Sequence, residues 1–149
     1  MSYYNRRSQF LRTLSTIQKT KYTNYEVIVV DDGSVEEHRL EDVEGVTLIR
    51  VNPNTKDYIN PCVPFNKAIK AATGDVVILQ NPECLHLGDV VSHAANNVTE
   101  DNYISYECYS FDQYLTERLP KTVDEDTMER IKNVLKQLPQ VPPAAGECG

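Results

Sequence analysis

Two adjacent carboxylates, Asp31 and Asp32, precede Gly33 and Ser34 and directly follow an apolar run at residues 27–30. The run reads Val-Ile-Val-Val, and an unbroken β-branched stretch is typical of a strand buried on both faces of a parallel sheet. In open α/β sheets, ligands bind in the crevice outside the carboxyl ends of the strands. The two carboxylates are therefore candidates for a binding site. Asp-Asp-Gly-Ser is also ordinary turn chemistry, so these four residues alone leave both interpretations open.

Polar side chains also follow two other apolar runs. Asn52 and then Asp57 come after residues 46–51, and Asn81 and Glu83 come after residues 75–79. If the strands are parallel, all of these side chains reach one crevice, whereas random surface acids would be scattered over both edges. Carboxylates there can accept hydrogen bonds from a nucleobase or a ribose, or can bind a hard divalent cation that accompanies a diphosphate. Both together describe a sugar nucleotide with its metal.

Helical periodicity alternates with these strands. We expect helices over residues 10–17, 64–73 and 87–98, a short polar helix over 35–43, a further strand over 103–109, and a charged helical segment over 115–138. Strands that alternate with helices predict βαβ units with right-handed crossovers. The predicted fold class is therefore α/β, with a mostly parallel sheet flanked by helices.

Composition limits the function classes. A chain of 149 residues is long enough for one domain with a real core, and its 40% hydrophobic and 25% charged residues are ordinary for a soluble protein. A net charge of −7 argues against nucleic-acid binding through the phosphate backbone, which needs a basic surface. No apolar run approaches the length of a membrane span. Because the four cysteines show no metal-site or redox spacing, we expect free thiols in the cytoplasm. They are Cys62, Cys84, Cys108 and Cys148.

Several segments, in this order, resemble the GT-A glycosyltransferases of family 2. Residues 1–7, Met-Ser-Tyr-Tyr-Asn-Arg-Arg, look like the end of the family's first strand and the start of its first helix. Residues 25–34 match its second strand and Asp-Asp-Gly-Ser signature, and residues 65–69 and 74–83 resemble the helix and strand that lead to its metal-binding Asp-x-Asp. The resemblance covers about residues 1–112 and implies the Rossmann-like GT-A fold.

The resemblance also implies a donor such as a UDP-sugar. Ser2 and Tyr4 fall where the family holds the uracil, by backbone contact and by stacking. Asp32 falls where a carboxylate accepts the uracil N–H, while Asp31 orders the turn. Asn66 lies on the helix facing the donor, although a polar residue near a helix N-terminus explains it equally well. His86 is in reach of the sugar, but a local hydrogen bond is the better explanation.

The chain departs from the family at the metal site. Where the family has Asp-x-Asp, this sequence reads Asn81-Pro82-Glu83. Asn81 still offers a carbonyl oxygen, and Glu83 is then the expected ligand of Mn²⁺ or Mg²⁺, with weaker affinity than two carboxylates provide. Loss of metal dependence is the competing interpretation.

The resemblance further predicts that the chain is a fragment. The family's first strand would lie mostly before Met1, and its acceptor-binding half would lie after Gly149. No catalytic base is identified, because Glu107 and Asp112 are best explained as solvated surface acids. We divide the chain into a nucleotide-sugar-binding core at 1–112, a helical segment at 113–138 and a linker-like tail at 139–149. An incomplete sheet has open edges, so an oligomer is possible.

Three functional hypotheses follow. The first is a glycosyltransferase that moves a sugar from a nucleotide diphosphate to a glycan, lipid or protein acceptor, with assistance from a metal. The second is a catalytically inactive GT-A-like binding or interaction module, which the missing base and the altered Asp-x-Asp favour. The third is a nucleotidyltransferase, which is disfavoured because Arg6 and Arg7 come without the glycines of a phosphate-binding loop.

Overall fold

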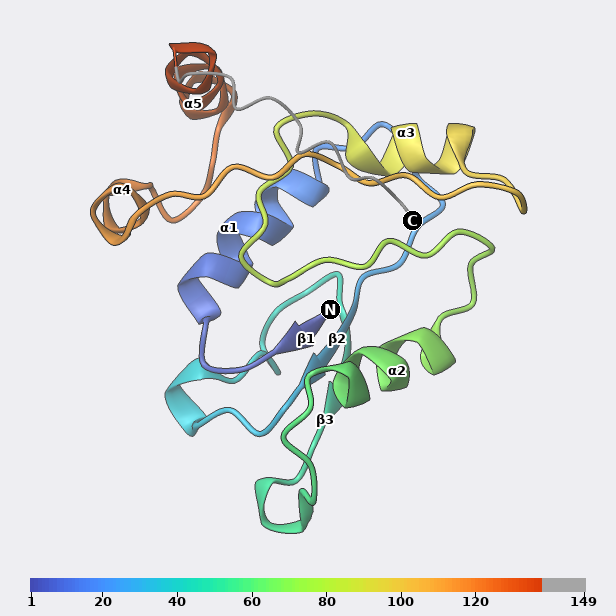
Figure 1. Ribbon diagram of the computed structural model, residues 1–149. Coiled ribbons are helices and arrows are strands. Elements are labelled where there is room, and N and C mark those ends of the chain that lie inside the picture. The colour runs from blue at the N-terminus through green and yellow to red at the C-terminus, as the bar shows by residue number, and fades with distance from the viewer. Residues whose placement is uncertain (138–149) are drawn as a thin grey trace, which may run out of the picture.

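A computed structural model describes residues 1–137 of the chain (Figure 1). The predicted tail at 139–149, with Cys148, lies outside the described residues. The elements are β1 (Ser2–Tyr3), α1 (Arg7–Ile17), β2 (Ile28–Asp31), the 3₁₀ turn η1 (Glu36–His38), β3 (Thr47–Arg50), the 3₁₀ turn η2 (Pro53–Thr55), α2 (Cys62–Ala71), α3 (Val90–Asn97), α4 (Gln113–Arg118) and α5 (Glu125–Gln137).

The described strands form one parallel sheet in the order β1-β2-β3. Asp31 at the end of β2 pairs with Tyr3 of β1 on one side and with Arg50 of β3 on the other. The strands end level with one another, so the residues that follow them emerge at one edge. The predicted α/β class with a parallel sheet is confirmed, and β2 and β3 lie where the sequence placed strands.

The two faces of β2 are covered by different helices. Phe10 and Leu14 of α1 are buried in one cluster with Val29. Val30 points to the opposite face and packs in a second cluster with Ala68 of α2. Burial of such side chains stabilises the fold by about 1.5–3 kcal/mol each. Figure 1 shows α1 and α2 on opposite sides of the sheet, and this layering makes the central strand a rigid support for the residues that follow it.

The prediction of a strand over residues 75–79 is wrong. This segment has no regular secondary structure and lies outside the sheet, and Val77 and Leu79 are 47% and 61% exposed. A strand requires a neighbouring backbone with which to exchange hydrogen bonds. Because β1 comprises only Ser2–Tyr3, no strand of the described chain runs beside residues 75–79 to pair with them.

A hollow of about 590 Å³ lies beside this segment. Its walls come from β2, α2, α3 and residues 74–80, and they include Ile28, Ala68, Ile78 and Ala94. Apolar side chains thus surround a space on this side of the sheet.

Three other local predictions need correction. The strand predicted over 103–109 is an irregular segment in which Tyr103 is 87% exposed. The polar helix predicted over 35–43 is reduced to the single turn η1. The helical segment is split into α4 and α5, because Pro120 disfavours helical backbone at the preceding Leu119.

The helical segment packs against the rest of the chain. Ile131 and Leu135 of α5 are buried with Val123 in a third cluster, and Leu85 and Leu87 pack against it. None of the helices formed by residues 1–137 has the length and hydrophobicity that a membrane crossing requires. Within the same residues, the cysteines Cys62, Cys84 and Cys108 are free thiols.

Candidate functional site

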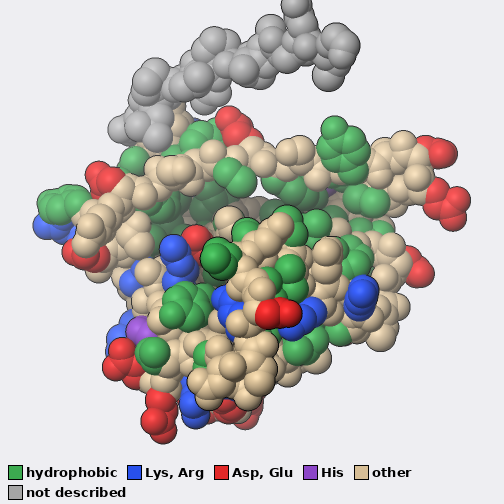
Figure 2. Space-filling model, turned by 60° about the horizontal axis from the view of Figure 1, so that its bottom comes forward, with side chains coloured by type: hydrophobic (Ala, Val, Ile, Leu, Met, Phe, Trp, Pro, Cys, Tyr) green, Lys and Arg blue, Asp and Glu red, His purple; other side chains and the backbone are tan. Residues whose placement is uncertain are grey.

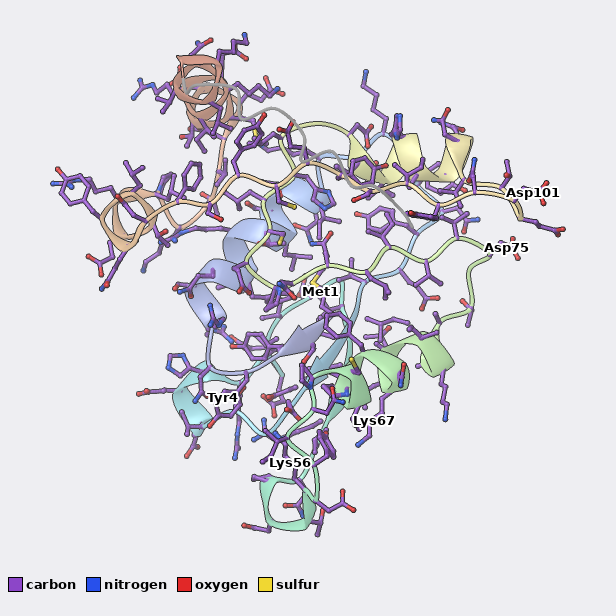
Figure 3. All side chains as sticks on the ribbon, in the orientation of Figure 1. Met1, Tyr4, Lys56, Lys67, Asp75 and Asp101 are labelled. Atoms are coloured by element: carbon purple, nitrogen blue, oxygen red, sulfur yellow. The ribbon has the colours of Figure 1, made fainter. Side chains whose placement is uncertain are left out.

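The site lies at the edge of the sheet where the parallel strands end. The Asp32 N–H donates to the Tyr3 carbonyl at 2.8 Å, and the Val51 N–H donates to the Asp31 carbonyl at 2.8 Å. These bonds hold the ends of β1, β2 and β3 close together. Figure 3 shows Tyr4, Lys56 and Lys67 at this end of the molecule, with Asp75 and Asp101 far from them.

Asp31 stabilises the turn that begins the site. Its side chain is fully buried, and its carboxylate accepts a hydrogen bond from the Ser34 N–H at 2.8 Å. The Arg50 guanidinium donates to the other carboxylate oxygen at 2.6 Å and to the Ser34 carbonyl at 2.8 Å. These contacts fit the predicted role of Asp31, which is to order the turn. The buried Asp31 carboxylate is not exposed to a ligand.

A second set of contacts ties the loop after β1 to this turn. The Asn5 N–H donates to Ser34 Oγ at 3.0 Å, and the Val35 N–H donates to the Asn5 side-chain oxygen at 2.9 Å. Asn5 has a φ of 50°, a left-handed conformation that asparagine tolerates better than most residues. Gly33 also has a positive φ of 93°, and it lies against Pro53. The turn is therefore fixed from both sides.

Asp32 is the carboxylate that reaches the crevice. One oxygen accepts from the Tyr58 hydroxyl at 2.7 Å and the other from Lys56 Nζ at 2.6 Å, and its side chain is 14% exposed. Burial and the hydrogen bond to Asp32 raise the pKa of Tyr58 to about 12, so the hydroxyl stays protonated and remains a donor. Lys56 and Lys67 Nζ each lie 5.1 Å from the centroid of the Tyr58 ring. One carboxylate and two ammonium groups thus surround one phenol.

This basic cluster was missed by the sequence analysis. Lys56 and Tyr58 follow η2 and Lys67 lies on α2, so no local motif links them to Asp32. Figure 2 looks towards the end of the molecule where the strands stop, and it shows Lys and Arg side chains interspersed with Asp and Glu over that face. The two lysines beside Tyr58 are therefore a local feature of a chain whose net charge is −7.

The residues predicted to hold the base are Ser2 of β1 and Tyr4, which directly follows β1. The Tyr4 side chain is 54% exposed, which leaves an aromatic face available for stacking. The backbone groups of Met1 and Tyr3 bond to β2, so those of Ser2, which alternate with them, face the open edge of the sheet. Ser2 is intermediate in exposure.

Other predicted site residues are less closely gathered. Asn66 is exposed on α2, and Asn81 is exposed in a turn in which its carbonyl accepts from the Cys84 N–H at 3.3 Å. Glu83 accepts a hydrogen bond from Arg6 at 3.2 Å, so the carboxylate that was predicted to bind the metal is paired with a guanidinium. Asp57 and Glu107 are exposed.

His86 and Asp112 have structural partners. His86 is buried, its Nε2 lies 2.6 Å from Gln80 Oε1, and its N–H donates to Thr16 Oγ1 at 3.0 Å. Burial lowers the pKa of His86, with a smaller opposing effect from Asp89. Asp112 accepts from the Leu115 N–H at 2.8 Å and caps α4. The bond to Gln80 is the kind of local contact expected for His86, and Asp112 is exposed, as expected for a surface acid, with a capping role that was not predicted.

A comparison with known protein families identifies the chain. The sequence profile described as glycosyl transferase family 2 matches residues 1–149. The chain belongs to glycosyl transferase family 2. No curated protein and no solved structure matches it at a significant level. Membership implies glycosyl transfer in general, with binding of a nucleotide-sugar donor and an acceptor.

The side chains of this family 2 glycosyltransferase fit a divalent cation poorly. The family generally uses such a metal, and a hard cation prefers several oxygen ligands with negative charge. At the position that the resemblance assigns to the metal, Asn81 carries no charge, and the charge of Glu83 is balanced by Arg6. Among residues 1–137, no group of three or more histidine, cysteine, aspartate or glutamate side chains is arranged to hold a metal.

Proposed function

We propose that this chain binds a nucleotide-sugar of the UDP class as the donor for transfer to a glycan, lipid or protein acceptor. The observation that carries the proposal is the placement of Asp32 beside the end of β1, where the exposed Tyr4 follows. The hydrogen bond from the Asp32 N–H to the Tyr3 carbonyl holds these two loops in register. A stacking ring and a hydrogen-bonding carboxylate at one sheet edge are the two groups that a flat base requires.

The polar groups around Asp32 favour uracil over cytosine. Uracil presents an N–H between two carbonyl oxygens, whereas cytosine presents an unprotonated ring nitrogen at the same place. An ionised carboxylate only accepts hydrogen bonds and a lysine ammonium only donates them. A carboxylate has about four lone-pair sites, so Asp32 can accept the uracil N–H beside its bonds from Tyr58 and Lys56, while Lys56 also donates to a neighbouring carbonyl of the base. Cytosine would place two acceptors face to face at Asp32.

The remaining positions complete the proposed donor site. Ser2 offers the backbone groups that face the open edge of β1, and the exposed amides of Asn66 and Asn81 offer neutral donors and acceptors for the ribose or the sugar. Asp31 supports the site indirectly through the turn at Ser34. No catalytic base is assigned, since Glu107 is exposed in an irregular segment and Asp112 caps α4.

Calorimetric titration with uridine and with cytidine tests the base site. We expect uridine to bind more tightly than cytidine, and Asp32→Asn to weaken uridine binding about tenfold or more, because a hydrogen bond to a charged acceptor is lost. Asp57→Asn is the matched control, since it removes an exposed carboxylate from the same region. Equal effects of the two substitutions, or no uridine binding by the folded chain, would refute the proposal.

The alternative of a catalytically inactive binding module is favoured by one contact, the pairing of Glu83 with Arg6. The module and the enzyme both bind uridine, so binding does not separate them. An activity assay separates them: the chain is incubated with UDP-sugars and a panel of acceptors, and released UDP is measured by chromatography. Released UDP that disappears in the Asp32→Asn variant supports the enzyme, and donor binding without any product supports the module.

A further inference from the structure

The contact between Arg6 and Glu83 carries a consequence for how the donor diphosphate is held. Arg6 Nη1 lies 3.2 Å from Glu83 Oε1, across 77 residues of sequence. Glu83 stands where the resemblance to the family places a metal ligand. The positively charged group nearest to that carboxylate in the described chain is therefore the guanidinium of Arg6, which belongs to the same loop as Tyr4.

A divalent cation would meet an unfavourable balance of charge at this place. Two carboxylates would offer two negative charges, but Glu83 and Arg6 together offer none, and Asn81 contributes only a neutral carbonyl. A cation bound to Glu83 would lie against the guanidinium or would have to displace it. Like charges at such close range repel, and the repulsion is stronger where solvent is partly excluded. The Glu83 and Arg6 side chains are 36% and 54% exposed, so the pair is screened only in part.

The Arg6 guanidinium bonds to Glu83 through Nη1 and its side chain is 54% exposed, so its other N–H donors can face an anion. Arg6 precedes the first residue of α1, and within the described chain no side chain caps this helix end and no acidic residue lies in its first turn. The helix therefore contributes positive potential beside the guanidinium. A guanidinium binds phosphate oxygens through paired N–H donors. Lys67 adds positive charge beside Tyr58 at the edge of the sheet reached by Asp32, whereas the charge of Lys56 is balanced by Asp32.

We propose that Arg6, positioned by Glu83, binds the donor diphosphate in place of a divalent cation, so that nucleotide binding by this chain does not depend on metal. The inference rests on the proposed nucleotide site. It assigns Arg6 as a binding residue and Glu83 as its positioning residue. It makes the metal role predicted for Glu83 unnecessary.

Titration of uridine and of UDP, each with Mn²⁺ and with excess EDTA, tests the inference. We expect UDP to bind with the same affinity under both conditions. Arg6→Ala should weaken UDP binding about tenfold or more while uridine binding is unchanged, because only UDP carries the phosphates. Arg130→Ala is the matched control, since it removes an arginine from a surface ion pair on α5. Glu83→Gln should leave UDP binding measurable in EDTA.

Each contrary result has a distinct meaning. UDP binding that requires Mn²⁺ and is lost in Glu83→Gln would overturn the inference and restore Glu83 as a metal ligand. Equal weakening of uridine and UDP in Arg6→Ala would also overturn it, because Arg6 would then act through the fold. Absence of uridine binding by the folded wild-type chain would instead overturn the proposed nucleotide site itself. Electron paramagnetic resonance of Mn²⁺ added alone gives an independent readout, and saturable Mn²⁺ binding that Glu83→Gln abolishes would contradict the inference.

Discussion

Replacement of Asp31 by asparagine should strongly destabilise the fold, although Asp31 is not a proposed ligand contact. The carboxylate is fully buried and accepts one hydrogen bond from the Ser34 N–H and one from Arg50. In Asp31→Asn, the carbonyl oxygen can still accept from Ser34. The amide nitrogen then faces Arg50 Nη1 across a distance that is 2.6 Å in the wild type, so two donors oppose each other.

The magnitude follows from the burial of the two partners. Removal of one partner of a fully buried ion pair typically costs about 3–5 kcal/mol. The Arg50 side chain is 27% exposed and keeps its bond to the Ser34 carbonyl, which places the cost at the lower end, about 3 kcal/mol. For a domain of this size, that corresponds to a fall in melting temperature of roughly 10 °C.

Urea denaturation followed by far-ultraviolet circular dichroism measures the free energy of unfolding. Asp42→Asn is the matched control, because it removes a carboxylate that also binds an arginine, Arg7, but is 71% exposed. It should change stability little. The double variant Asp31→Asn/Arg50→Met should be less unstable than the sum of the two single variants, since each already removes the same pair. A loss below about 1 kcal/mol in Asp31→Asn, with an unchanged denaturant slope, would refute this account of the turn.

Two further predictions concern the turn and the buried histidine. Gly33→Ala should lower the free energy of unfolding by about 1–2 kcal/mol, because φ is 93° and the added Cβ would lie 3.1 Å from Pro53 Cβ. The control is Gly88→Ala, where a Cβ meets open space, and equal melting temperatures of the two variants would contradict the prediction. Burial lowers the pKa of His86, so the unfolded state binds more protons in weak acid, and the free energy of unfolding should decrease as pH falls through about 6.5. Denaturation at several pH values should show a smaller decrease in His86→Gln, with the Met1 amine, whose pKa burial lowers to about 6, contributing equally to both proteins. Identical pH profiles would exclude this contribution from His86.

The sequence alone was sufficient for the strands that are supported from both sides. The β-branched run at 27–30 predicts β2 because each of its side chains finds a helix on one face or the other, as Val29 and Val30 do. The position of Asp31 and Asp32 at the carboxyl end follows directly, whereas their different roles were implied only by the resemblance to the family. These features can be predicted because they depend on the local sequence pattern and on the general right-handedness of βαβ connections.

Strand pairing and ion pairs between residues far apart in the sequence were decided by the tertiary structure. Residues 75–79 have the composition of a buried strand, but pairing is a property of two backbones, and the described chain places no strand beside them. The same reason applies to the site. Lys56 lies 24 residues from Asp32, and Glu83 lies 77 residues from Arg6. The sequence determined which charges are present, and only the folded chain determined that Glu83 is balanced by an arginine, because Coulomb energy depends on distance in space rather than on separation along the chain.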